Sequence, residues 1–201
     1  AVLLLLKADW GWRRTLYTLG LVAVVTWGAE FVGSSTGFPF GEYSYTERLQ
    51  PQIGHVPLLI PFAWFMMLPP AWAIAQAITG PKRHSLRHKL AFIGISAVAL
   101  TAWDLFLDPQ MVGWGFWEWA HPEGYFGIPW SNYGGWLLVA ALVTALAQPP
   151  TLKLAPYITI YAIVWFLQSF GQAVFWGQVG PALVGCIAMG GLMLLAWLRT
   201  K

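Results

Sequence analysis

The stretch "LAFIGISAVALTAWDLFLDPQMVGWGFWEW" (residues 90–119) determines the fold that we predict for this chain. Residues 90–107 are mostly apolar and approach the roughly 20 residues that a helix needs to cross the hydrocarbon core of a membrane. Asp104 and Asp108 lie at the end of this segment, and three tryptophans follow them. The sequence therefore predicts a membrane-spanning helix that ends in a polar and aromatic region.

The composition of the whole chain extends this prediction. Of its 201 residues, 58% are hydrophobic and 9% are charged, whereas about a quarter of the residues of a soluble domain are charged. We therefore predict an all-α fold: a polytopic membrane helix bundle that forms a single transmembrane domain over residues 1–201. About six transmembrane helices are expected, at roughly 15–34, 56–79, 90–107, 133–149, 155–176 and 180–198.

The positions of the basic residues predict the topology. Lys and Arg cluster at every second end of the apolar segments, and such ends face the cytoplasm. We therefore expect a multi-pass protein of the cell membrane with cytoplasmic N- and C-termini. The net charge of +3 follows from this topology, so no nucleic-acid partner is predicted. His84 and His88 belong to a basic loop and are expected to be solvated. The initial "AVLLLL" is too short for a signal sequence and fits the end of an upstream helix.

Two loops, 35–55 and 108–132, then lie together on the outer face. Both are rich in Gly, Pro and aromatic residues, which predicts ordered, aromatic-rich loops rather than flexible linkers. Of the eight acidic residues, only Asp9 is expected on the cytoplasmic side. In the second span, Pro69 and Pro70 are expected to kink or break the helix.

Polar residues within the spans predict a pocket. With a rise of 1.5 Å per residue, Glu30, Asp104 and Gln168 come to a common level, roughly 20 Å along three outward-running spans. An ionisable group at such a depth costs at least about 2.5 kcal/mol, so it should face the bundle interior. Asp104 and Asp108 are four residues apart and share a helix face. We predict a polar pocket that opens outward and is lined by Glu30, Asp104, Asp108, Gln168, Gln172, His55 and Asn132.

Structural roles could explain several of these residues. Asp108 precedes Pro109 and could simply end the helix. Glu30 and Gln168 could form hydrogen bonds between helices. The outer tryptophans could belong to the aromatic belt that membrane proteins place at the membrane–water interface.

The residues also limit the chemistry. Four scattered histidines exclude a di-iron lipid desaturase, and the chain lacks a nucleophile elbow, a phosphate-binding glycine loop and a CxxC pair. The spacing of Asp104 and Asp108 is that of membrane prenyltransferases, but there is no second aspartate-rich motif, and Arg48 is the single basic residue of the outer loops other than histidine. The class of reaction that remains possible is acid–base chemistry on an apolar, uncharged substrate. No metal or other cofactor is predicted. Apolar surroundings can keep a carboxyl group protonated and able to donate its proton.

Three blocks resemble a known family. "EFVGSSTGFPFGEYSYTERLQPQIGHVPLLIPFAWFMM" (30–67), "WDLFLDPQMVGWGFWEW" (103–119) and "GYFGIPWSNYGGW" (124–136) are similar to integral-membrane carotenoid biosynthesis proteins. This family includes carotenoid 1',2'-hydratases of the γ-carotene and bisanhydrobacterioruberin type. The resemblance covers about half of the chain, in the right order. It implies addition of water to the terminal isoprenoid double bond of an acyclic carotenoid end group, without a redox cofactor.

The expected mechanism begins when Asp104 or Glu30 protonates the olefin. Aromatic faces would stabilise the resulting tertiary carbocation, and Asp108, with His55 or Asn132, would orient the attacking water. The partners are a carotenoid with a lycopene-like or monocyclic end group, water and membrane lipid. A membrane carotenoid cyclase, or a non-catalytic carotenoid- or lipid-binding protein or transporter, are the alternatives. The predicted substrate-binding residues are Trp27, Tyr43, Tyr45, His55, Trp103, Trp117, Asn132, Gln168 and Gln172.

Overall fold

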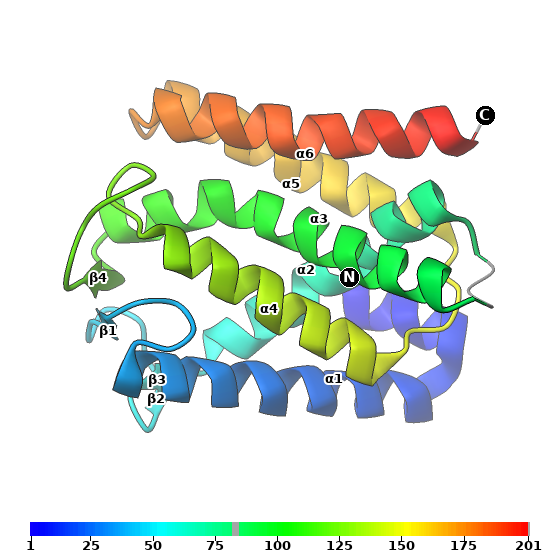
Figure 1. Cartoon of the computed structure of the whole chain (residues 1–201), viewed down its shortest axis with the longest axis horizontal. Coiled ribbons are helices and arrows are strands. Elements are labelled where there is room, and N and C mark those ends of the chain that lie inside the picture. The colour runs from blue at the N-terminus through cyan, green and yellow to red at the C-terminus, as the bar shows by residue number, and fades with distance from the viewer. Residues whose placement is uncertain (82–84, 201) are drawn as a thin grey trace.

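A computed structural model of the chain describes residues 1–81 and 85–200. Within these residues it contains six helices that are long and apolar enough to cross a membrane, which confirms the predicted all-α bundle (Figure 1). The helices are α1 (Val2–Thr36), α2 (Leu59–Thr79), α3 (Leu86–Gly113), α4 (Trp130–Ala147), α5 (Leu154–Val174) and α6 (Val179–Thr200).

Helix α1 consists of two helical segments joined at Gly11. The backbone of Gly11 has φ 78° and ψ 165°, a conformation that only glycine adopts readily. Next to this bend, the Trp10 indole donates to the Thr151 carbonyl, and Asp9 lies 3.6 Å from the Lys153 ammonium. The bend therefore lies beside the connection between α4 and α5.

Helices α2 and α3 form the centre of the bundle. Helix α2 contacts α1, α3, α5 and α6, and 78% of its most apolar window is buried, against 17% for α5. Helix α2 continues through Pro69 and Pro70, which are buried, so the prolines do not end the helix. Close packing by neighbouring helices compensates for the lost backbone hydrogen bonds.

The two outer loops are ordered, and they pair as short strands that the sequence analysis did not predict. Strand β1 (Tyr43–Tyr45) pairs antiparallel with β4 (Trp117–Trp119), and β2 (Gln52–Ile53) pairs with β3 (Val56–Pro57). Arg48 Nη1 donates to the Trp114 carbonyl at 2.9 Å and ties the two loops together. The β1–β4 ribbon covers one end of the bundle (Figure 1).

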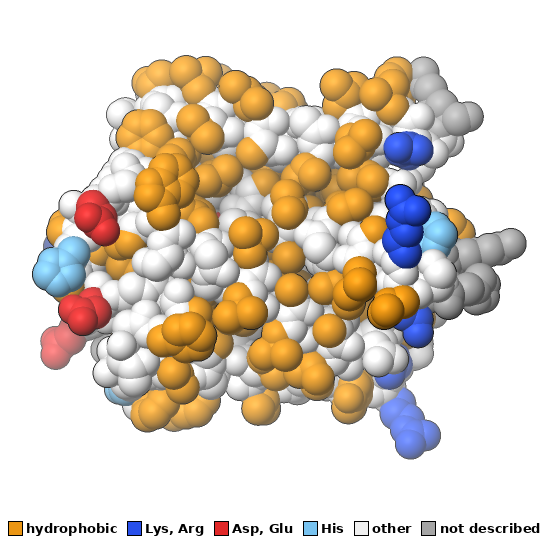
Figure 2. All heavy atoms as spheres, in the orientation of Figure 1, with side chains coloured by type: hydrophobic (Ala, Val, Ile, Leu, Met, Phe, Trp, Pro, Cys, Tyr) orange, Lys and Arg blue, Asp and Glu red, His pale blue; other side chains and the backbone are white. Residues whose placement is uncertain are grey.

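Exposed basic and acidic side chains lie mainly at opposite ends of the bundle. Figure 2 shows basic side chains at one end and acidic ones at the other, with hydrophobic side chains predominating over the face between them. This distribution agrees with the spacing of charges along the sequence. Lys82, Arg83, His84 and Lys201 lie outside the described residues.

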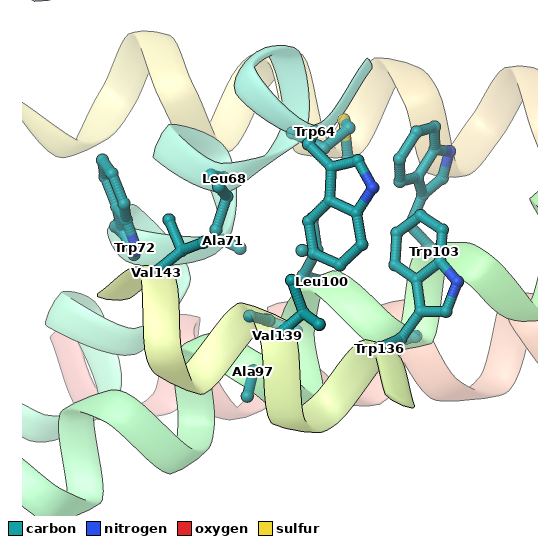
Figure 3. Close-up of a cluster of buried hydrophobic side chains, with 14 of the residues drawn as sticks. Trp64, Leu68, Ala71, Trp72, Ala97, Leu100, Trp103, Trp136, Val139 and Val143 are labelled. Atoms are coloured by element: carbon teal, nitrogen blue, oxygen red, sulfur yellow. The ribbon is translucent and has the colours of Figure 1, made fainter. Parts of the chain in front are cut away.

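Tryptophans join α2, α3 and α4 in the core of the bundle (Figure 3). Trp64 and Trp136 stack with ring centroids 4.2 Å apart, and Trp103 meets Trp136 edge to face at 6.1 Å. Deeper in the bundle, the Trp72 indole donates to the Thr144 hydroxyl at 2.9 Å. Large rigid rings with few rotatable bonds hold the three helices in register, and these helices carry the polar residues described next.

Candidate active site

A small cavity of about 30 Å³ lies between the ribbon and the helices. A cavity of this size holds roughly one water molecule. Two carboxyl groups, those of Glu30 and Asp108, line it from α1 and α3. The aromatic residues in its wall are Phe40, Tyr43, Tyr45, Trp64, Trp117, Trp119 and Trp136.

Glu30 is held by two tyrosines from strand β1. The hydroxyls of Tyr43 and Tyr45 both donate to Glu30 Oε2, at 2.5 and 2.8 Å. Burial, and next the nearby Glu30 carboxylate, raise the pKa of both tyrosines well above the usual range, so the phenols keep their protons. Glu30 is therefore a buried hydrogen-bond acceptor, and one of its oxygens accepts from two tyrosine hydroxyls that stay protonated.

Asp104 and Asp108 form a second carboxyl cluster one helical turn apart on α3. The Asn132 amide from α4 joins them, because its Nδ2 donates to Asp104 Oδ2 at 2.9 Å and to Asp108 Oδ2 at 2.5 Å. The two aspartates are 0% and 2% exposed. A single amide therefore uses both of its N–H groups to hold two buried carboxyl groups side by side.

The hydrogen bonds of the two aspartates are unequal. Asp108 Oδ1 accepts from the Trp117 indole at 2.7 Å and from the Trp119 indole at 3.4 Å. Asp104 Oδ1 is buried and has no hydrogen-bond partner. Asp108 has three donors and Asp104 has one, so the surroundings favour negative charge on Asp108 and leave one oxygen of Asp104 free.

Comparisons with known proteins agree with the resemblance seen in the sequence. A sequence model of the family described as "Carotenoid biosynthesis protein" matches residues 1–192. The chain belongs to this family. It is 34% identical over 135 residues to bisanhydrobacterioruberin hydratase of Haloarcula japonica; the match covers 67% of this chain and 45% of that protein. The chain thus spans about half the length of the curated relative that it matches. No solved structure matches it.

Most of the site residues that were predicted from the sequence lie together around the cavity. Glu30 and Asp108 face the cavity, and Asp104 adjoins it through Asn132. Trp103 lies behind Trp136, against which it packs. The predicted residues that line the cavity itself are Glu30, Tyr43, Tyr45, Asp108, Trp117 and Asn132.

Four predicted residues lie elsewhere. Gln172 of α5 donates to the Phe106 carbonyl of α3 at 2.6 Å. It also donates to Gln168 Oε1 within α5 at 3.3 Å. Trp27 donates to the Ile53 carbonyl at 3.3 Å, and His55 is exposed and hydrogen-bonded to Ser35. A common depth along the membrane predicted that Gln168 lies near the acids, but depth does not specify the direction in which a helix faces.

Four aromatic residues of the cavity were not identified as site residues from the sequence, namely Phe40, Trp64, Trp119 and Trp136. Trp119 had a usable signal, because "WEW" (117–119) alternates with period two and a strand would place both indoles on one face. Trp64 lies within an apolar span that gives no such signal. Only the packing of α2 against α4 brings its ring to the cavity.

Proposed function

We propose that the chain is a carotenoid hydratase that adds water to the terminal isoprenoid double bond of an acyclic end group. The observation that carries the proposal is the buried Asp104–Asn132–Asp108 cluster beside a water-sized, aromatic-lined cavity. Membership of the carotenoid biosynthesis family and the name of the Haloarcula japonica relative support it. Neither the cluster nor the cavity requires a cofactor for this reaction.

Asp104 is the proton donor in this mechanism. Its Oδ1 is buried without a partner, so a proton on that oxygen is free to be transferred to the less substituted olefin carbon. Protonation of Asp104 also relieves repulsion within the pair, since two adjacent carboxyl groups do not readily ionise together. The sequence left the donor open between Asp104 and Glu30, and the two tyrosine donors on Glu30 favour Asp104.

Asp108 is the base that activates water. Three donors stabilise its carboxylate form, and it lines the cavity that has room for a water molecule. The water oxygen bonds to the tertiary carbocation while its proton passes to Asp108. One proton leaves Asp104 and one reaches Asp108, so the charge of the pair is conserved and a proton exchange restores the starting state.

The aromatic wall stabilises the carbocation. Indole and phenol faces attract positive charge through the ring quadrupole, with Trp the most effective. Trp64 of α2 and Trp117 of β4 both line the cavity. Glu30 supplies a second acidic group beside the same cavity, and its attraction for a positive charge strengthens in an environment of low dielectric constant.

The orientation of the bundle follows from the same charge distribution. We infer that the basic end faces the cytoplasm and that the ribbon and its cavity lie at the outer face, because cytoplasmic ends carry an excess of Lys and Arg. The sequence has a single cysteine, Cys186. In a Cys186→Ser background, a cysteine introduced at Glu123 should then react with a membrane-impermeant thiol reagent in intact cells, and the Cys186→Ser variant alone is the control.

Product mass tests the proposed reaction. The wild-type chain and Asp104→Asn are expressed in bacteria that make lycopene, and pigments are separated by liquid chromatography. We expect a product heavier by one water from the wild type and, since general acid catalysis contributes about 10²–10⁴-fold, almost none from Asp104→Asn at equal protein level. An isomer of unchanged mass would instead indicate a cyclase. Unaltered lycopene in both strains would contradict hydration of this substrate.

A further inference from the structure

Ala63 of α2 is the smallest residue in the wall of the small cavity. Ile60, Ala63 and Trp64 follow one face of α2 at helical spacing, and all three line the cavity. Every other residue of the wall is aromatic or branched aliphatic, or carries a carboxyl or amide group. The methyl group of Ala63 therefore leaves room that a larger side chain at this position would occupy.

The size and polarity of the cavity suit water rather than hydrocarbon. Its volume of about 30 Å³ exceeds the roughly 10–15 Å³ that one water molecule requires. It is far below the roughly 300 Å³ at which pockets for organic ligands begin. A confined water also needs about two to four polar partners, and Tyr43, Asp108 and Asn132 line the cavity from β1, α3 and α4. The reactant that fits this space is the attacking water.

The rings around the cavity are held in place, so its size is fixed. Trp64 stacks on Trp136 of α4 with ring centroids 4.2 Å apart (Figure 3). The Trp117 indole is tied to Asp108 Oδ1 by a hydrogen bond of 2.7 Å. Well-packed walls do not readily move to accept added methyl groups. A larger side chain at Ala63 would therefore fill the cavity instead of displacing its wall.

The fate of the carbocation depends on whether water reaches it. When water is present, its oxygen bonds to the cationic carbon and its proton passes to Asp108. When water is excluded, a carbon next to the cationic centre loses a proton to the carboxylate, and an olefin of unchanged mass forms. Each route takes one proton from a carboxyl group and returns one, so neither needs a co-reactant other than water.

We propose that Ala63 is a specificity-determining residue: the room beside its methyl group admits the water that captures the carbocation, which selects hydration over loss of a proton. This inference rests on the proposed function and adds the residue that determines the product. Asp104 is not among the residues that line the cavity and adjoins it through Asn132. Filling the cavity should therefore block capture by water and leave protonation of the olefin intact.

Deuterium distinguishes the two fates. Purified protein in detergent is incubated with lycopene in D₂O, so that the carboxyl group delivers deuterium to the olefin. Loss of an ordinary proton then returns lycopene that carries deuterium, whereas capture of water gives the hydrated product, and mass spectrometry after liquid chromatography measures both. Ala63→Val and Ala63→Leu fill the cavity in two steps, and Ala63→Gly keeps the room. Ala141→Leu is the matched control, because this alanine of α4 is also partly buried and is not among the residues that line the cavity.

The quantity compared is the ratio of hydrated product to deuterated lycopene. We expect Ala63→Leu to lower it at least about tenfold, since one methylene in a tight pocket changes selectivity by roughly 10–200-fold. Ala63→Val should lie between Ala63→Leu and the wild type, and Ala63→Gly and Ala141→Leu should keep the wild-type ratio. Uptake of deuterium shows in the same sample that a variant is folded and protonates the olefin.

Two results would overturn the role of Ala63 and leave the hydratase intact. One is an unchanged ratio in both Ala63→Val and Ala63→Leu. The other is an equal fall of both products in a variant whose thermal unfolding matches that of the wild type, because the side chain would then affect the rate and not the choice of product. Wild-type protein that gives neither hydrated product nor deuterium uptake would refute the hydratase, and the inference with it.

Discussion

The two carboxyl clusters of the bundle differ in how completely their oxygens are hydrogen-bonded. Glu30 receives both of its donors from one strand, β1, on a single oxygen. The aspartate pair receives its donors from α4 and β4 and keeps one oxygen, Asp104 Oδ1, without a partner. Two donors on one oxygen hold the Glu30 carboxyl group in place, whereas Asp104 has a single donor and a buried oxygen without a partner. On this comparison we propose that the aspartates carry out the chemistry and that Glu30 supports it.

The largest effect is expected at the aspartate pair. Asp108→Asn keeps the shape of the side chain but removes the base, so the hydration rate should fall about 10²–10⁴-fold. Conversion of lycopene per amount of purified protein measures this effect. Activity within a few-fold of the wild type would show that another group accepts the proton from water.

A smaller effect is expected at Glu30. Glu30→Gln keeps an acceptor for the two tyrosines and removes a charge near the developing carbocation, which should lower the rate on the order of 10- to 100-fold. The same conversion assay, run in parallel on Glu30→Gln and Asp108→Asn, measures this effect. If Glu30→Gln proved the more severe of the two, the assignment of roles to the clusters would be reversed.

The tyrosines should affect stability more than rate. Tyr45→Phe removes one hydrogen bond to a carboxyl group, which is worth about 1.5–3 kcal/mol, and a few-fold loss of rate should accompany it. The midpoint of thermal unfolding in detergent measures the first effect. Tyr125→Phe is the matched control, since the Tyr125 hydroxyl bonds to the Leu105 backbone carbonyl at 3.2 Å rather than to a carboxyl group. Equal losses from both substitutions would contradict a special role for Glu30 as acceptor.

The smallest effect is expected away from both clusters. Gln172→Leu removes the contact with the Phe106 carbonyl and should cost about 1 kcal/mol of stability with the rate unchanged within twofold. His55→Ala, at an exposed position, should change neither quantity. A tenfold fall in rate from either substitution would restore that residue to the site predicted from the sequence.

Much of the fold could be predicted because its causes are local. Apolar segments of sufficient length appear directly in the sequence, and so does the alternation of basic ends. The expected spans agree with the observed helices within a few residues at most ends, and α1 starts earlier because residues 2–10 form a second helical segment before Gly11. Helix α2 continues through Pro69 and Pro70 because packing on several sides outweighs the local tendency of proline to end a helix.

The sequence by itself determined that Glu30, Asp104 and Asp108 face the interior, because burying a charged group in lipid is too costly for any other arrangement. Only the tertiary structure decided which partners meet them. Trp117 reaches Asp108 because β4 pairs with β1, and Asn132 reaches both aspartates because α4 packs on α3. Depth in the membrane is a property of one helix, whereas the direction of a side chain depends on how the helices pack.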